Sequence, residues 1–213
     1  MFLFLKSLSR SVHEEHQEQP ELSKTKGDLC TSLTVWRKSL IISCNGFTVI
    51  DSDGNLVYRV DNYMARPKEL ILMDGSGKSI LTMHRNKNLG LIDTWLVYGG
   101  EVGDYCTSAK SSEKPIFYVK KCINILHGNP NVLAYVYCQS SDKRYAYMIE
   151  GSYSHRSCKV VDETKRMVAE IRRKDAIIGG ISFGLEVFML IVQPGFDPGF
   201  AMALVILLDQ MFS

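Results

Sequence analysis

The chain has 213 residues, of which 46% are hydrophobic and 23% are charged, and its formal net charge is +2. This balance is that of an ordinary globular protein and excludes a wholly disordered, collagen-like or coiled-coil chain. The small net charge gives no support to non-specific binding of nucleic acid. A chain of this length buries about 70% of its unfolded surface in one domain, so disulfide bonds are not required for stability.

The first 27 residues differ from the rest of the chain in composition. Residues 1–5 (MFLFL) are apolar, but the run stops at Lys6, which makes it shorter than the about 7 to 15 apolar residues of a signal-peptide core. Almost no large apolar residue lies between Val12 and Leu22. This composition predicts a flexible tail over residues 1–27.

Metal ligands and cysteines give little sign of a metal site or of a disulfide framework. His13 and His16 would need further ligands from folded elements, because a structural zinc site has four ligands, so we expect no metal there. No C-x-x-C pair occurs, and without a secretory signal we expect an intracellular, reducing environment. The cysteines expected to be free thiols are Cys30, Cys44, Cys106, Cys122, Cys138 and Cys158.

From Leu33 onward, apolar residues alternate with period two and turn residues recur every 8 to 12 positions, as is typical of an all-β sandwich or barrel. Asp53-Gly54, Gly75-Ser76-Gly77 and Gly128-Asn129-Pro130 are suited to tight turns, so neighbouring strands should pair antiparallel. The expected strands are residues 32–38, 40–50, 56–63, 68–74, 78–85, 91–98, 116–124, 131–138, 145–150, 157–162, 167–174 and 184–193.

Alternation along the expected strand 167–174 assigns its side chains to two faces. Ala169 and Ile171 should point into the core, whereas Glu170, Arg172 and Lys174 should point outward. The strand therefore has one buried face and one charged face.

A helix is expected to begin after Asp197, because an N-cap acid is followed by Pro198 at the first helical position. Residues 200–208 are apolar on every side of such a helix, so it cannot lie on a surface with one wet face. A core helix is the preferred interpretation; docking to a partner or membrane surface, and a short membrane span, are the alternatives. A span needs about 20 apolar residues, and this run stops at Asp209.

Twelve strands followed by one apolar helix suggest a barrel wrapped around that helix. The sequence resembles the plant LURP-one-related proteins in residues 56–63, in the hairpin 70–83 and in the terminal block 194–212. The resemblance implies a mainly β fold: a twelve-stranded antiparallel β-barrel at 28–213 that encloses a helix at about 198–212, as in the Tubby C-terminal domain. Phospholipid scramblases share this barrel, although a shared fold transfers no activity by itself.

The resemblance implies a non-enzymatic binding or scaffold protein in plant defence or stress signalling, with no cofactor.

Three short motifs resemble parts of catalytic or metal sites, but each is incomplete. Residues 75–79 end like a phosphate-binding loop, but Leu72 stands where the first glycine of that loop is required. Residues 180–184 match G-x-S-x-G, yet no histidine follows His155 to accept the serine proton. Residues 51–55 lack the later ligands of an EF-hand. We therefore expect no catalytic residues and no metal, and an enzyme or lipid translocator would need a polar cavity that the sequence does not indicate.

Basic residues on strands are the remaining candidates for binding, because an anionic headgroup contributes about 1 kcal/mol for each nearby Lys or Arg. A solvated charged surface is the alternative interpretation. Alternation places Lys120 and Lys121 on opposite faces. The expected lipid-binding residues are Lys120, Lys121, Arg172, Arg173 and Lys174.

The expected partners are anionic phospholipid headgroups at a membrane surface, or a signalling protein recruited by the outer sheet or by the tail. No nucleic acid partner is expected, and the oligomeric state stays open. The expected location is the cytoplasm, with a position at the plasma membrane periphery or in the nucleus as alternatives.

Overall fold

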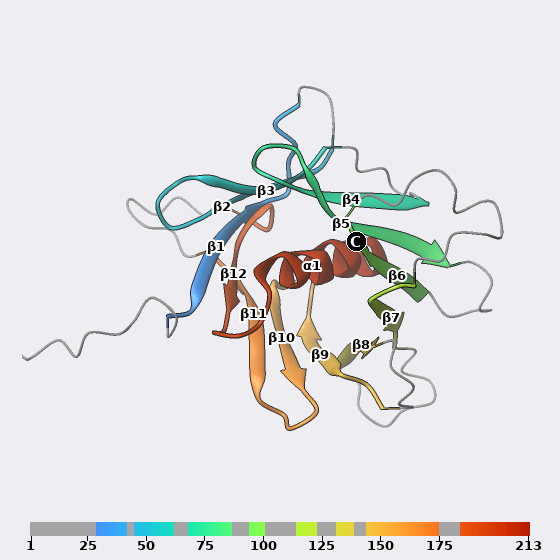
Figure 1. Cartoon of the computed structure of the whole chain (residues 1–213). Coiled ribbons are helices and arrows are strands. Elements are labelled where there is room, and N and C mark those ends of the chain that lie inside the picture. Colours follow the sequence, from blue (N-terminus) through green and yellow to red (C-terminus); the bar gives the residue numbers. More distant parts are fainter. Residues whose placement is uncertain are drawn as a thin grey trace, which may run out of the picture.

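Twelve strands surround one helix in the part of the chain that the computed structural model describes: residues 29–41, 45–61, 68–86, 94–100, 114–122, 131–138, 144–174 and 184–213 (Figure 1). The elements are β1 (Thr31–Trp36), β2 (Phe47–Ile50), β3 (Leu56–Val60), β4 (Glu69–Asp74), β5 (Ser79–Asn86), β6 (Thr94–Gly99), β7 (Phe117–Lys121), β8 (Val132–Cys138), β9 (Tyr147–Ser152), β10 (Ser157–Asp162), β11 (Met167–Arg173), β12 (Val187–Val192) and α1 (Pro198–Phe212).

The strands form a closed antiparallel barrel in which each strand pairs with its neighbours in the sequence. The barrel closes between β1 and β12, with Thr31 opposite Val192 and Trp36 opposite Val187. Because neighbouring strands are antiparallel, the ends of the even-numbered strands, the start of β1 and the start of α1 lie at one end of the barrel. We call this end the mouth.

Three hairpins at the mouth have the same turn chemistry. In each, the side-chain oxygen of an aspartate accepts the backbone N–H groups two and four positions later, at 2.8–3.0 Å; the aspartates are Asp51, Asp74 and Asp162. Hydrogen bonds from side chains in the same turns, together with these backbone bonds, lower the pKa of all three carboxyl groups. The predicted positive φ occurs at Gly54 (87°) and Gly77 (92°), where glycine has no steric penalty.

The prediction of twelve antiparallel strands closing into a barrel is confirmed, and Ala169 and Ile171 point into the core as expected. The expected strand 40–50 is too long: β2 begins at Phe47, and the described residues 40, 41, 45 and 46 before it are not in a strand. Ser39 turns the chain there: its hydroxyl accepts the Ile41 N–H at 3.0 Å and donates to a carboxylate at 3.2 Å.

Several expectations fall outside the described residues and stay predictions. They are the tail at 1–27 with its two histidines, the turn at 128–130, most of the G-x-S-x-G stretch, and Cys44 and Cys106. The division of the chain at residue 28 is likewise a prediction. The other four cysteines are free thiols, as predicted.

Helix α1 fills the inside of the barrel, and twelve of its fifteen residues are buried. Figure 1 shows the helix enclosed by the strands, which explains why its sequence is apolar on every side. The predicted N-cap is confirmed, because Asp197 Oδ1 accepts the Phe200 N–H at 2.6 Å. The prediction of a core helix is therefore confirmed, and docking to a separate surface is wrong.

Within the described residues, α1 does not reach the length and apolar character required to cross a membrane.

A buried carboxylate fixes the other end of α1 to the barrel. Asp209 is 1% exposed and accepts hydrogen bonds from Arg37 Nε at 3.0 Å, Tyr153 Oη at 3.0 Å and Ser213 Oγ at 2.7 Å. The Arg156 guanidinium lies 4.0 Å from the same carboxylate. A buried charge of this kind is tolerated only with such partners.

We predict that Leu204→Ala lowers the free energy of unfolding by about 2–5 kcal/mol, because it leaves a cavity at a fully buried position of α1. The measurement is urea denaturation. The matched control is Leu185→Ala at an exposed leucine, which should change stability by about 0.5 kcal/mol or less. Equal effects of the two substitutions would contradict the packing of α1 inside the barrel.

We predict that Asp209→Asn costs about 3–5 kcal/mol, because it removes the carboxylate that faces the buried Arg156 guanidinium and that holds Arg37 and Tyr153 to α1. Glu186→Gln is the matched control, since Glu186 pairs with the same Arg37 at 3.6 Å but lies at the surface. That control should cost about 1 kcal/mol or less. Chemical denaturation at neutral pH measures both, and a larger loss for the control would argue against the role of Asp209.

Thiol labelling separates the buried cysteine from the exposed ones. Burial raises the pKa of the Cys158 thiol to about 12, so almost no thiolate forms there at pH 8. We predict that a disulfide reagent modifies the exposed Cys30 and Cys138 in the native protein and reaches Cys158 only after unfolding. Native labelling of Cys158 at the rate of Cys138 would contradict this.

The same thiol predicts how stability depends on pH. Because the thiol of Cys158 ionises near its usual pKa in the unfolded chain and not in the folded one, the free energy of unfolding should fall as the pH rises from about 9 towards 12.

Candidate functional site

Because α1 fills the barrel, a ligand has to bind at the surface of the barrel or at its ends. The described residues form two grooves there. One lies at the mouth, around the start of α1, and we call it the mouth groove. The other crosses the outside of β11, β12, β1 and β2, and we call it the outer groove.

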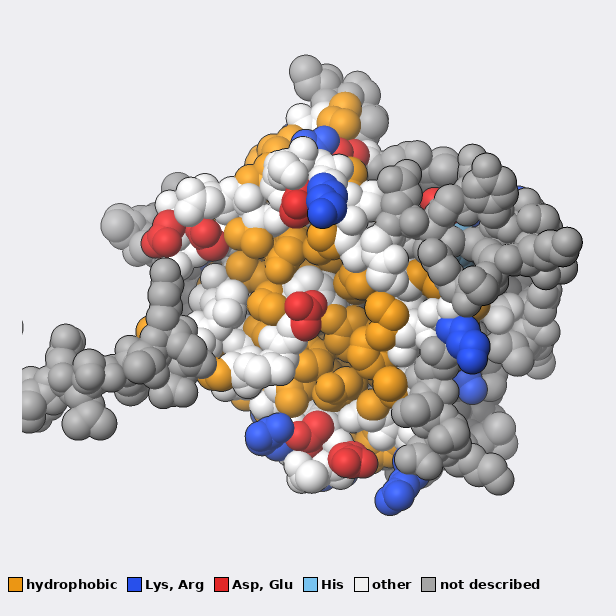
Figure 2. All heavy atoms as spheres, in the orientation of Figure 1, with side chains coloured by type: hydrophobic (Ala, Val, Ile, Leu, Met, Phe, Trp, Pro, Cys, Tyr) orange, Lys and Arg blue, Asp and Glu red, His pale blue; other side chains and the backbone are white. Residues whose placement is uncertain are grey.

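The mouth groove encloses about 680 Å³, within the range of small-ligand sites. Its apolar lining comes from four strands, from the segment before α1 and from the first turn of α1, and the residues used below are Tyr58, Ile80, Phe117, Tyr147, Phe196 and Phe200. Figure 2 shows hydrophobic side chains gathered over the middle of this face, where Figure 1 places α1, with an acidic side chain among them and further charged side chains around them.

Aromatic rings pack against one another in this groove. Phe117 and Phe200 stack with their centroids 4.1 Å apart, and Phe196 meets Tyr147 and Phe200 edge-on at 5.1 and 5.7 Å. Burial, together with the nearby carboxylate of Asp197, raises the pKa of the Tyr58 hydroxyl. Burial is also the main reason that the pKa of Tyr147 is raised. Both phenols therefore stay protonated at neutral pH and can donate hydrogen bonds.

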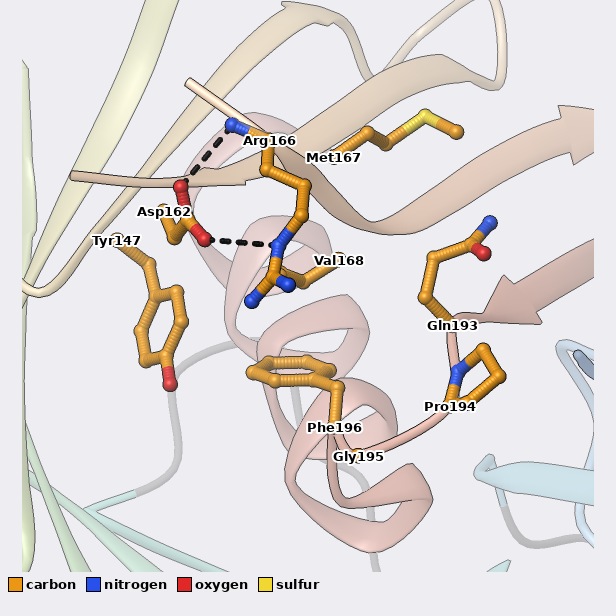
Figure 3. A pocket seen from close by; sticks show the side chains of 9 residues that line it. All are labelled: Tyr147, Asp162, Arg166, Met167, Val168, Gln193, Pro194, Gly195 and Phe196. Carbon is orange, nitrogen blue, oxygen red and sulfur yellow. Dashed lines mark hydrogen bonds and ion pairs between the residues drawn. The ribbon is translucent and has the colours of Figure 1, made fainter. Parts of the chain in front are cut away.

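A second hollow of about 510 Å³ adjoins the first and shares Tyr147, Gly195 and Phe196 with it. Figure 3 shows the Arg166 side chain extending over this hollow from the wall that carries Asp162, towards the ring of Phe196. Arg166 Nε lies 3.2 Å from Asp162 Oδ2. From here on, the name mouth groove covers both of these hollows. The mouth groove has an aromatic floor and a charged rim.

The outer groove, about 550 Å³, contains three of the predicted basic residues, at 172–174. Arg172 is opposite Met189, Met189 is opposite Thr34, and Thr34 is opposite Ile50. These side chains therefore form one row across four strands, with basic groups at one side and apolar groups along the floor.

Hydrogen bonds hold the basic side chains of the outer groove in place. Arg172 pairs with Glu170 at 2.7 Å, and Lys174 Nζ donates to Thr34 Oγ1 at 2.9 Å. Arg173 Nε donates to a backbone carbonyl at 3.1 Å.

The other two predicted residues lie elsewhere. Lys120 and Lys121 are on β7, four strands away from β11 in the barrel. Lys120 lies on the outside over the Tyr137 ring, at 4.9 Å. Lys121 points to the end of α1, where it donates to the Met211 carbonyl. The structure thus keeps residues 172–174 together and separates both lysines from them.

Lys121 has a structural role that the sequence did not indicate. Its ammonium group lies 4.4 Å from the centre of the Phe212 ring as well as bonding to the last turn of α1. A cation is favourable at a helix C-terminus, where unpaired carbonyls concentrate negative partial charge. The residue therefore stabilises the helix end and is turned away from the outer surface.

The two glycine-rich motifs with described residues form turns. Residues 75–78 connect β4 to β5 within the hairpin closed by Asp74, and residues 51–55 connect β2 to β3 within the hairpin closed by Asp51. The mouth groove itself is not evident from the sequence. Its lining comes from separate segments, and the only signal is the recurrence of aromatic residues near strand ends.

Comparison with known proteins gives a consistent result. The family model described as LURP-one-related matches residues 31–209. Protein LURP-one-related 17 of Arabidopsis thaliana is 51% identical, with all of both chains covered. Protein LURP-one-related 8 of the same plant is 45% identical over 94% of this chain and 97% of that protein.

A solved structure supports the fold separately. The chain is similar to an Arabidopsis thaliana protein determined by X-ray crystallography, with a TM-score of 0.60 and 23% identity, covering 85% of this chain and 91% of that one. At this identity the likeness concerns the fold alone. Given the match of the family model and of the full-length relatives, the chain belongs to the LURP-one-related family.

Proposed function

We propose that this protein is a non-enzymatic binding protein that attaches to an anionic membrane surface through the outer groove. The observation that carries this proposal is the position of Arg172, Arg173 and Lys174 beside an apolar floor. Phosphate groups of lipid heads would meet the cations, and the upper acyl region would meet the side chains of Met189 and Ile191.

The magnitudes favour a weak, reversible attachment. Three cations near an anionic surface contribute about 3 kcal/mol, which is less than the about 4 kcal/mol of a millimolar complex. Apolar contacts from the floor would add to this. The protein would therefore bind membranes peripherally and depend on the content of anionic lipid.

The interior of the barrel supports a role in binding over a role in catalysis. Residues 200–208 of α1 occupy the place where an enclosed substrate would lie, so any partner has to be met by the outer surface. The Tubby-like and scramblase-like relation implied by the sequence fits a cytosolic membrane surface. We propose the defence or stress role, and a cytosolic location, on the same resemblance.

A protein partner is the second candidate function. Trp36, Leu40 and Ile41 are 42–52% exposed in one short stretch at the end of β1. Large exposed apolar and aromatic side chains are typical of the centre of a protein interface. A partner recruited by this outer surface would need no lipid.

We predict that Arg172→Glu/Lys174→Glu reduces sedimentation with phosphoinositide-containing phosphatidylcholine vesicles at least about ten-fold, because two favourable charges are reversed. The matched control is Lys78→Glu/Lys120→Glu, which makes the same change of net charge on β7 and on the β4–β5 turn. That control should keep most of the binding. Binding of the native protein should also weaken as salt approaches about 1 M, where the screening length is about 3 Å.

The membrane proposal would be overturned if the native protein and the Arg172/Lys174 variant sedimented equally with the vesicles, or if neither sedimented with them. A partner that is lost from the Trp36→Ser variant, and kept by the vesicle-binding variant, would favour the second candidate.

A further inference from the structure

The mouth groove takes no part in the function proposed above, although it is the larger apolar hollow. Ile116 at its edge is 41% exposed, and Tyr58, Ile80, Phe117 and Phe196 are only partly buried. A contiguous apolar area of this kind on a soluble domain usually marks a binding site. The question is which occupant fits it.

The N-terminal part of the chain enters the barrel at the rim of this groove. Thr31 is opposite Val192 at the mouth end of β12, and Cys30 Sγ donates to Gln193 Oε1 at 3.1 Å. Gln193 itself lines the second hollow, as Figure 3 shows. The chain that precedes Leu29 therefore starts next to the groove.

This preceding chain carries an apolar segment of its own, at residues 1–5 (MFLFL), separated from Leu29 by the 23 residues 6–28. A stretch of 23 residues spans at most about 80 Å, and averages about 25 Å when it has no secondary structure. The segment can therefore reach every part of the mouth. A tether of this kind gives an effective concentration of about a millimolar, so even a weak contact would be populated within one molecule.

We propose that residues 1–5 of this chain dock into the mouth groove of the same molecule. In an extended conformation Phe2 and Phe4 point to one side, where they add to the aromatic cluster of Phe117, Phe196 and Phe200. The segment would cover the partly exposed rings and remove apolar surface from water.

Polar groups around the groove complement this occupant. The hydroxyl groups of Tyr58 and Tyr147 can donate hydrogen bonds to the backbone carbonyls of an extended segment. Lys6 follows the apolar residues directly. The carboxylate of Asp197 lines the larger hollow, and Glu163 lines a neighbouring hollow at the β10–β11 turn. The apolar residues of the segment thus match the apolar floor of the groove, and its Lys6 can meet the Asp197 carboxylate, while the rim carries both an acidic and a basic side chain, Asp162 and Arg166.

Photo-crosslinking in the full-length protein tests the contact directly. With Phe4 replaced by p-benzoylphenylalanine, we expect cross-links within one chain to peptides that contain Ile116 and Phe117, or Phe196 and Phe200. The control places the same photoreactive residue at Val12. The yield at the mouth peptides from position 4 should exceed that from position 12 at least about five-fold, since only a docked segment is held at the groove.

A solvatochromic dye tests whether the groove is covered. Phe2→Ser/Phe4→Ser should raise the fluorescence of Nile red at least about two-fold, because the apolar floor is then open to the dye. Val12→Ser/Leu22→Ser, with the same number of apolar side chains removed from the tail, should leave the fluorescence unchanged.

Either of two results would overturn the proposal. One is cross-links from position 4 that go to other surfaces, or that join two separate chains, which would assign the groove to a second copy. The other is dye binding by the Phe2/Phe4 variant that equals or falls below that of the native protein. Neither result bears on vesicle binding, so this proposal and the membrane proposal fail independently.

Discussion

The packing of an apolar helix inside a closed sheet is the constraint on which the rest of this structure depends. Eight strands make a barrel that side chains alone can fill, and a barrel of twelve is wider. Helix α1, with a diameter of about 10–12 Å, supplies the missing core. The helix in turn has no polar face, so it is stable only where strands surround it. Asp197 caps the start of the helix, and Asp209 holds its end to the barrel through Arg37 and Tyr153.

Filling the interior shapes what the protein can do. With the axis occupied, the remaining chemistry lies in two grooves of different character. The outer groove joins basic side chains to an apolar floor and suits an anionic, amphipathic surface. The mouth groove is aromatic, with charged groups of both signs at its rim, and suits an apolar segment of a chain. Such a division would let one small domain bind two unlike partners.

Local patterns were sufficient to predict the elements of this fold. Period-two alternation and turn residues gave the twelve strands, and Asp197-Pro198 before an apolar run gave the helix and its start. Alternation also placed Lys120 and Lys121 on opposite faces correctly. The choice of a barrel over a sandwich rested on the apolar helix, which has to be enclosed, and on the family resemblance, because closure of β1 onto β12 is a contact between residues far apart in the chain. The grooves could not be predicted for the same reason, and the contact of the Ser39 hydroxyl with the Asp61 carboxylate joins residues 22 positions apart, which no alternation reveals.

The pairing of β1 with β12 has a consequence for how this protein is made. During synthesis, the first strand leaves the ribosome long before its final partner, and the filling helix emerges later still. Until then, the growing sheet has two open edges and an unfilled apolar lining, a combination that favours aggregation. Folding should therefore be completed only after β12 and α1 have left the ribosome, and nascent copies that still lack them should depend strongly on chaperones.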